Sequence, residues 1–290
     1  MASLIYHAGA LGDFITTLPA IARWREDRPA ERHILLGKPA HAALAPPFDE
    51  TWDTEAAVFA PLFAGSAASG SPLAENIGSV TSALLFAVPS SPLAATIERL
   101  GARGIVRQDP FPAAIVHIVD YHLSLFSPED PAKPPVPRIH LSAAPEAEDF
   151  RETVAIHPGS GSAQKNWPRG RFIDLAARLA DRGSKICWIV GPAEAEIDPL
   201  PGGDHWRCLP LAVLAGRLAR CALYVGNDSG VTHLAAAVGS PTLALFGGSD
   251  SRVWAPRGPN VEIIDSFPRG VEAIETRDVL RVCLNFLKEK

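Results

Sequence analysis

The stretch from Tyr224 to Gly248, YVGNDSGVTHLAAAVGSPTLALFGG, contains a strand, a polar turn, a helix and a second strand in direct succession. The first apolar run ends at Val225, and the residues from Gly226 to Gly230 turn the chain into an alanine-rich helix. A glycine and a proline then stop that helix before the next apolar run. This order predicts a buried parallel strand followed directly by a helix.

The start of this predicted helix has the chemistry of an anion site. The backbone N–H groups of Ser229, Gly230 and Val231 lie in its first turn, where they and the helix dipole favour a phosphate. Asp228 comes just before them. Its carboxylate either caps the helix or accepts hydrogen bonds from sugar hydroxyls beside the phosphate.

A second loop follows the predicted strand at 154–157, in the segment VAIHPGSGSAQKNWP (residues 154–168). Its small residues allow a ligand to approach the backbone closely. Ser160 and Ser162 offer hydroxyl donors, and Lys165 supplies a compact positive charge suited to a diphosphate oxygen. A lone lysine in a loop is usually an ordinary surface residue, so the assignment of Lys165 depends on its neighbours in this segment.

A third loop lies near the N-terminus, in LIYHAGALGDFITTLP (residues 4–19), between a predicted strand and an amphipathic helix. Gly9 and Gly12 permit a tight turn. Asp13 stands at the helix entry, where it is either the N-cap or a general base at the end of the strand.

These three segments carry recognisable motifs in order. They are Gly12-Asp13 followed by Thr17-Leu18-Pro19-Ala20, His157-Pro158-Gly159 leading to Lys165 and Trp167-Pro168, and Asp228-Ser229-Gly230 with His233. With these motifs the sequence resembles glycosyltransferase family nine, the heptosyltransferase group that builds the lipopolysaccharide inner core from ADP-heptose.

The resemblance implies a GT-B architecture, in which two Rossmann-like α/β domains with parallel sheets face each other across a cleft. Residues 1–140 would form the acceptor-side domain, with Gly9 and Gly12 in its loop, and residues 146–290 the domain that binds the nucleotide sugar. It also implies an inverting, metal-independent transfer from a donor such as ADP-heptose to a hydroxyl of a lipopolysaccharide-type or other glycan, with no cofactor.

The resemblance also assigns roles to single residues. Asp13 matches the catalytic base, Lys165 the diphosphate-binding lysine and Asp228 the carboxylate that contacts the donor sugar. Four further positions match the phosphate side of the helix and the ribose contact: Ser229, Gly230, His233 and Glu194.

Composition excludes several other classes of protein. The formal net charge of -5 gives no broad basic field, so we expect no nucleic-acid partner. The four cysteines and nine histidines form no ligand pattern, so we expect no metal and reduced thiols in a cytoplasmic protein. We find no apolar run long enough to span a bilayer and no secretory leader.

The order of predicted elements alternates strand and helix, which indicates parallel sheets. The proline-rich stretch at 127–145 predicts the interdomain linker, 65–72 a flexible polar loop, and 56–60 a strand. Apolar residues at helical spacing in 274–290 favour a last helix that packs back on the N-terminal domain. Basic residues among them leave peripheral contact with the inner membrane surface as the alternative.

Three rival functions are left open at this point. A nicotinamide-dependent dehydrogenase fits poorly, because Gly9-Ala10-Leu11-Gly12 is not the full dinucleotide motif. A nucleotide-sugar epimerase of the same architecture would release an isomerised sugar nucleotide without using an acceptor. A noncatalytic nucleotide-sugar-binding protein would keep its binding when Asp13 is replaced.

Overall fold

The chain divides into two compact units, residues 1–135 and 136–290. The computed structural model describes residues 1–126, 134–139, 141, 149–192 and 200–288. The unit boundary falls inside the proline-rich stretch expected to be a linker. Most of that stretch lies outside the described residues. The predicted ribose contact Glu194 also lies outside them.

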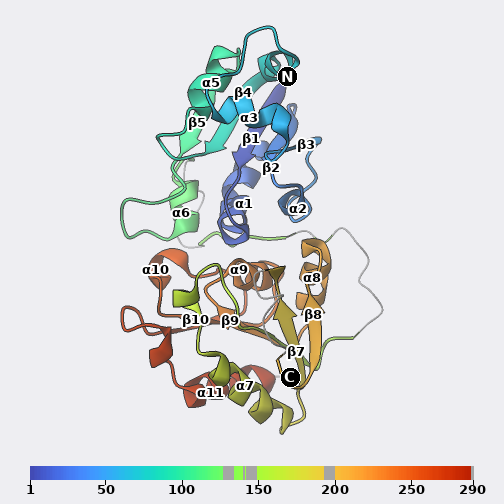
Figure 1. The fold of residues 1–290 in the computed structure, drawn as a ribbon, viewed down its shortest axis with the longest axis vertical. Coiled ribbons are helices and arrows are strands. Elements are labelled where there is room, and N and C mark those ends of the chain that lie inside the picture. Colours follow the sequence, from blue (N-terminus) through green and yellow to red (C-terminus); the bar gives the residue numbers. More distant parts are fainter. Residues whose placement is uncertain (127–133, 140, 142–148, 193–199, 289–290) are drawn as a thin grey trace. The chain divides into compact units, whose positions relative to one another are not determined.

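The first unit is built around a five-stranded parallel sheet in the order β3-β2-β1-β4-β5 (Figure 1). Its strands are β1 (Ala2–His7), β2 (Arg32–Gly37), β3 (Glu50–Asp53), β4 (Val80–Phe86) and β5 (Ile105–Gln108). Its helices are α1 (Leu11–Glu26), α2 (Pro39–Ala42), α3 (Ala60–Phe63), α4 (Pro72–Gly78), α5 (Leu93–Arg99) and α6 (Ile118–Leu123), with a 3₁₀ turn at Ala57–Phe59.

The second unit contains a six-stranded parallel sheet in the order β11-β10-β9-β6-β7-β8. Its strands are β6 (Thr153–His157), β7 (Lys185–Val190), β8 (Asp204–Arg207), β9 (Leu223–Asn227), β10 (Thr242–Phe246) and β11 (Val261–Asp265). Its helices are α7 (Arg169–Ala180), α8 (Leu211–Leu218), α9 (Gly230–Ala237), α10 (Ser251–Trp254) and α11 (Thr276–Lys288), with 3₁₀ turns at Ala163–Lys165 and Val271–Ala273.

The central strands of both sheets are buried, which explains why these apolar segments form parallel sheets. All residues of β6, β9 and β10 are buried, as expected for parallel strands covered on both faces. In the first unit, Leu4, Ile34 and Leu85 contribute to one core, and Trp24 of α1 ties the helix to β1 through a 2.7 Å hydrogen bond to Ser3 Oγ. The predicted α/β class with parallel sheets is therefore confirmed.

Some local predictions were wrong. The segment at 56–60 forms a 3₁₀ turn and the start of α3, and the strand β3 lies earlier, at Glu50–Asp53. The hydrophobic contacts of the 3₁₀ turn and α3 explain the difference, since Phe59 and Leu62 are buried in the core of the first unit.

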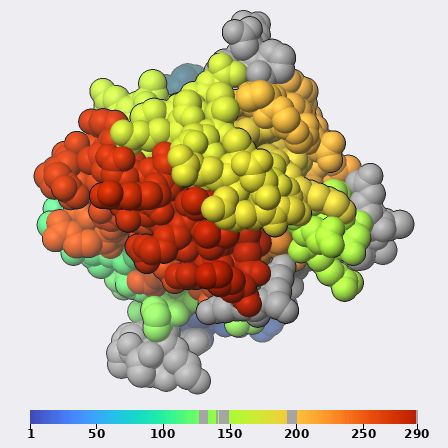
Figure 2. All heavy atoms as spheres, turned by 90° about the horizontal axis from the view of Figure 1, so that it is seen from below, coloured from blue at the N-terminus to red at the C-terminus, as the bar shows by residue number. Residues whose placement is uncertain are grey.

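The last helix, α11, packs on its own unit. Val279, Leu280 and Cys283 belong to the hydrophobic core that also contains Phe172 and Leu175 of α7. Figure 2 shows the red α11 and the yellow α7 side by side on one face. The apolar face of the helix is therefore occupied within the second unit, and the expected packing on the N-terminal domain stays a prediction.

In the part of the chain that the structure describes, no helix combines the length and the apolar character needed to cross a bilayer.

Candidate functional site

The loops after β6 and β9 bring Lys165 and Asp228 together. The two strands are neighbours, with His157 opposite Gly226, so their following loops meet at the same edge of the sheet. Lys165 Nζ lies 2.6 Å from Asp228 Oδ2, and the side chains are 34% and 8% exposed. A carboxylate this buried is costly without a cation or hydrogen-bond donors, so the ion pair is a built feature of this edge.

Asp228 does not cap the helix. The N-cap of α9 is Ser229, whose Oγ accepts the hydrogen bond from Thr232 N. The capping interpretation of Asp228 was therefore wrong, since the next residue in the chain takes that place. This leaves the carboxylate directed to Lys165.

The Ser229 hydroxyl belongs to a buried hydrogen-bond network. It lies 3.0 Å from Thr232 Oγ1 and 3.4 Å from His157 Nδ1, and Thr232 Oγ1 lies 2.9 Å from the Tyr224 hydroxyl. The network fixes the first turn of α9. Among the described residues, the backbone N–H groups of Gly230 and Val231 find no acceptor, as expected at the start of a helix.

Asn227 holds the two loops in register, a role that was not predicted from the sequence. Its Nδ2 donates to Pro158 O at 2.8 Å, and its Oδ1 accepts from Trp167 N at 2.9 Å. The residue is fully buried. Because Lys165 lies between these two anchor points, Asn227 fixes the loop that carries the lysine. The only signal in the sequence is an amide side chain at the end of a buried strand.

The other residues predicted for the donor site lie in the loop after β6 or on α9. The Ser160 Oγ donates to Ser162 O at 2.8 Å and accepts from Ser162 N at 3.2 Å, so it shapes its own loop. Ser162 begins the 3₁₀ turn that ends at Lys165. His233 is buried on α9.

Asp13 lies in the first unit, at the third position of α1. Its Oδ2 accepts a hydrogen bond from Ala10 N at 3.1 Å, while Ala10 itself is the N-cap. Asp13 is therefore not the cap residue, although its carboxylate satisfies a donor at the helix start. It is half-buried, and Gly12 precedes it in the first turn.

Close packing in this loop favours the small residue Gly9. A Cβ at Gly9 would lie 3.0 Å from His7 Cε1 and 3.1 Å from Asp13 Oδ2. The absence of a side chain at Gly9 therefore allows both the His7 ring and the Asp13 carboxylate to lie close to the loop backbone.

Three buried histidines meet in the first unit, a cluster that was not predicted from the sequence. The His7 ring centroid lies 6.5 Å from that of His41, and His122 packs edge-on against Phe86 at 5.1 Å. Burial, together with the nearby His41, His122 and Lys38, lowers the pKa of His7 to about 3. Burial also lowers the pKa values of His41 and His122 to about 4. All three are therefore neutral at physiological pH.

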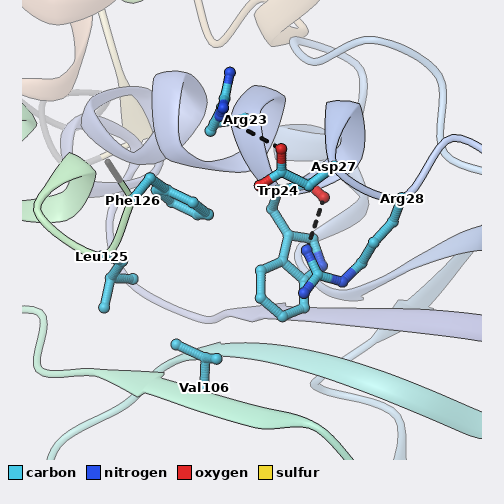
Figure 3. A pocket seen from close by; sticks show the side chains of 7 residues that line it. All are labelled: Arg23, Trp24, Asp27, Arg28, Val106, Leu125 and Phe126. Atoms are coloured by element: carbon cyan, nitrogen blue, oxygen red, sulfur yellow. Dashed lines mark hydrogen bonds and ion pairs between the residues drawn. The ribbon is translucent and has the colours of Figure 1, made fainter. Parts of the chain in front are cut away.

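A pocket of about 320 Å³ lies elsewhere in the first unit (Figure 3). It is lined by Arg23, Trp24, Asp27, Arg28, Val106, Leu125 and Phe126. The Arg28 guanidinium stacks over the Trp24 ring at 3.4 Å, and Arg23 pairs with Asp27 at 3.5 Å. These residues occupy the end of α1 opposite to Asp13, so the pocket is separate from the predicted acceptor loop.

Within the described residues, no group of three His, Cys, Asp or Glu side chains could hold a metal ion.

The family model of glycosyltransferase family 9 (heptosyltransferase) matches residues 78–278, which is more than half of the chain. The chain belongs to glycosyltransferase family 9. Within this family 9 chain, Lys165, Asn227 and Asp228 lie inside the matched region and Asp13 lies before it.

Curated relatives match part of the family 9 chain. It is 28% identical over 120 residues to lipopolysaccharide heptosyltransferase 3 of Escherichia coli K12, covering 37% of this chain and 34% of the relative. It is 35% identical over 100 residues to lipopolysaccharide heptosyltransferase 1 of Pseudomonas aeruginosa, covering 32% of this chain and 28% of the relative. The matches thus span about a third of the length of these relatives.

Solved structures are similar over the whole chain. A glycosyl transferase family 9 structure from Veillonella parvula aligns with a TM-score of 0.80 at 16% identity, covering 100% of this chain and 97% of that one. The E. coli heptosyltransferase WaaC with ADP aligns with a TM-score of 0.73 at 18% identity, covering 99% and 100%. At this identity the likeness establishes the fold, which is the expected GT-B class.

Proposed function

We propose that this family 9 chain is an inverting, metal-independent glycosyltransferase. It transfers a sugar, a heptose in our proposal, from a nucleotide diphosphate donor such as ADP-heptose to a hydroxyl of a lipopolysaccharide-type glycan. Two similar structures support the choice of donor, since one is described with ADP and another with ADP-2-deoxy-2-fluoro heptose. The curated relatives, named as lipopolysaccharide heptosyltransferases, support the choice of acceptor.

The single observation that carries this proposal is the Lys165–Asp228 pair beside the start of α9. Glycosyl transfer places negative charge on the leaving diphosphate, so the site needs fixed positive charge and N–H donors there. Lys165 and the N–H groups of Gly230 and Val231 supply both without a metal ion. The ammonium group has three donors, so it can contact Asp228 and a diphosphate oxygen at the same time.

The remaining roles complete the proposed reaction. Asp228 accepts hydrogen bonds from donor-sugar hydroxyls, and Asp13 removes the proton from the attacking acceptor hydroxyl. The Ser160 and Ser162 loop and His233 lie on the phosphate side of the donor, and Glu194 contacts the ribose. Gly9 and Gly12 shape the acceptor-side loop.

The proposed reaction also requires groups from both domains to act on the same donor molecule. The base belongs to residues 1–140 and the diphosphate site to residues 146–290, so both must reach one donor molecule at the moment of transfer. Closure of the domains over the donor would exclude water and suppress hydrolysis. We place the enzyme in the cytoplasm, with peripheral contact at the inner membrane surface if its acceptor is lipid-linked.

The test is a transfer assay with ADP-heptose and a lipopolysaccharide acceptor lacking its heptose residues, in the presence of EDTA. We expect ADP release together with a mass gain of one heptose on the acceptor, and a product of inverted anomeric configuration by NMR. Asp13→Asn should abolish transfer and leave ADP-heptose binding intact. Loss of activity in EDTA, or retained configuration, would overturn the mechanism.

The same assay separates the rival functions. An epimerase would change the sugar nucleotide when no acceptor is added. A noncatalytic binding protein would bind the donor but give no product with any acceptor, and its wild-type and Asp13→Asn forms would behave alike.

A further inference from the structure

A third loop reaches the donor site from β10. This strand lies beside β9 in the sheet, and Gly247, Gly248 and Ser249 follow its last residue. The Ser249 hydroxyl donates a 2.5 Å hydrogen bond to Asp228 Oδ2, the same oxygen that Lys165 contacts at 2.6 Å. Two donors from two different loops therefore meet on one oxygen of the carboxylate.

Gly247 and Gly248 allow this loop to lie close to its neighbours in the second unit. A Cβ at Gly248 would lie 2.8 Å from Gln164 O and 3.2 Å from Lys165 Cγ, so the loop backbone rests against the lysine stem. A Cβ at Gly247 would lie 2.3 Å from Val271 N. No larger residue fits at either place without a shift of the backbone, so the position of Ser249 is set by its neighbours.

The arrangement leaves the second carboxylate oxygen available. In the described part of the chain, Asp228 Oδ1 accepts no hydrogen bond, whereas Oδ2 accepts two. A carboxylate held through one oxygen has a fixed orientation, and its other oxygen points in a defined direction. A sugar hydroxyl needs such an acceptor at a fixed place.

We infer that Ser249 is a positioning residue for the sugar-binding carboxylate. Lys165 and Ser249 together orient Asp228 through Oδ2, so that Oδ1 is presented to a hydroxyl of the donor sugar. When a diphosphate oxygen draws on the ammonium of Lys165, the Ser249 hydroxyl keeps Oδ2 in place. This role rests on the proposed function, because it requires a nucleotide sugar at this site.

Calorimetric titration of the full chain with ADP and with ADP-heptose tests the role. Ser249→Ala should weaken ADP-heptose binding by about tenfold, the usual cost of losing one hydrogen bond to a charged group. It should leave ADP binding within about twofold of wild type, because ADP has no sugar for Asp228 to contact. Ser249→Thr keeps the hydroxyl and should restore binding of ADP-heptose.

Ser251→Ala is the matched control. Ser251 is the first residue of α10, two positions after Ser249, and its hydroxyl donates to Asp265 and not to Asp228. It should bind both ligands as wild type does. In the Asp228→Asn background, Ser249→Ala should have almost no further effect on ADP-heptose binding, since the two residues act through one contact.

The outcomes separate this inference from the proposed function. If wild type binds ADP-heptose and Ser249→Ala binds it equally well, the positioning role is wrong and the proposed function stands. Equal weakening of ADP and ADP-heptose would also refute it, because a general disturbance of the site affects both. A wild type that binds neither ligand would refute the proposed function and the role of Ser249 with it.

Discussion

Mild acid should unfold the first unit before the second. His7, His41 and His122 are buried and neutral in the folded chain, with pKa values lowered to about 3, 4 and 4. In the unfolded chain each imidazole titrates near its ordinary pKa of about 6.5. Between about pH 6 and pH 4 the unfolded state therefore binds more protons than the folded state, so stability is full above this range and falls as the pH is lowered.

The expected size of the effect follows from the number of groups. One group that titrates only in the unfolded state changes the free energy of unfolding by about 1.4 kcal/mol per pH unit, so three give about 4 kcal/mol per pH unit. A fall from about pH 6 to pH 4 would then remove about 7 kcal/mol, because His41 and His122 begin to take up protons in the folded chain near pH 4. This is comparable to the whole stability of an ordinary domain. His33, whose pKa burial also lowers, acts in the same direction.

Hydrogen exchange of the full chain, read by mass spectrometry between pH 7 and pH 4.5 with correction for intrinsic rates, measures this directly. We expect peptides from residues 1–126 to lose protection at a higher pH than peptides from residues 149–288. His122→Phe, which keeps a ring against Phe86, should reduce the pH slope of the first unit by about a third. Tyr121→Phe, one position earlier on α6, should leave it unchanged.

Equal loss of protection in both units, or a slope in His122→Phe that equals the wild-type slope, would refute this reasoning. Either result would mean that the histidines gain their protons without unfolding the first unit. The cluster would then be open to water on the timescale of exchange.

Three further perturbations have definite expected outcomes. Asn227→Ala leaves Trp167 N and Pro158 O without their partners, so urea unfolding should show a free energy of unfolding lower by about 2–4 kcal/mol. The control Asn76→Ala on α4 should cost little. A loss under about 1 kcal/mol in Asn227→Ala would show that the loop does not depend on these two hydrogen bonds. Gly247→Ala forces a Cβ against Val271 N and should lower the melting temperature. Gly216→Ala inside α8, where a Cβ meets nothing within 4 Å, should raise it slightly. Similar melting temperatures for the two variants would contradict the packing argument. Lys165→Met leaves the buried Asp228 carboxylate without its cation, so urea unfolding should show a loss of about 2 kcal/mol, whereas Lys185→Met at an exposed ion pair should cost little. Equal losses in the two variants would show that the Lys165–Asp228 pair does not stabilise the folded chain.

The sheets could be predicted from the sequence because parallel strands buried on both faces appear as short, continuous apolar runs. The residues of β6, β9 and β10 all follow this rule. The strand β8 does not, since DHWR contains one buried side chain and three polar or charged residues at the edge of the sheet. The short helix α4 was missed because its proline and glycine also fit a loop.

The site was only partly predictable for a different reason. Lys165 and Asp228 stand out as charges in the loops that follow apolar strands, so each loop suggested a polar contact by itself. The roles of Asn227 and the histidine cluster depend on contacts between residues far apart in the chain, such as Asn227 with Trp167 and His7 with His41. No local pattern reports such a contact, because the register of neighbouring strands decides it.

The topology explains why these particular loops form one site. The strands β10, β9 and β6 are adjacent and parallel, so the loop after each of them must emerge at the same edge of the sheet. The loop after β9 carries the Asp228 carboxylate. The loops after β10 and β6 each contribute one hydrogen-bond donor to the same oxygen of this carboxylate, Ser249 and Lys165 respectively. A single polar loop is common in α/β proteins, and alone it indicates little. Convergence of three neighbouring loops on one buried charge beside a helix start is a stronger argument for a ligand site, because none of the three side chains is needed to complete the hydrophobic core.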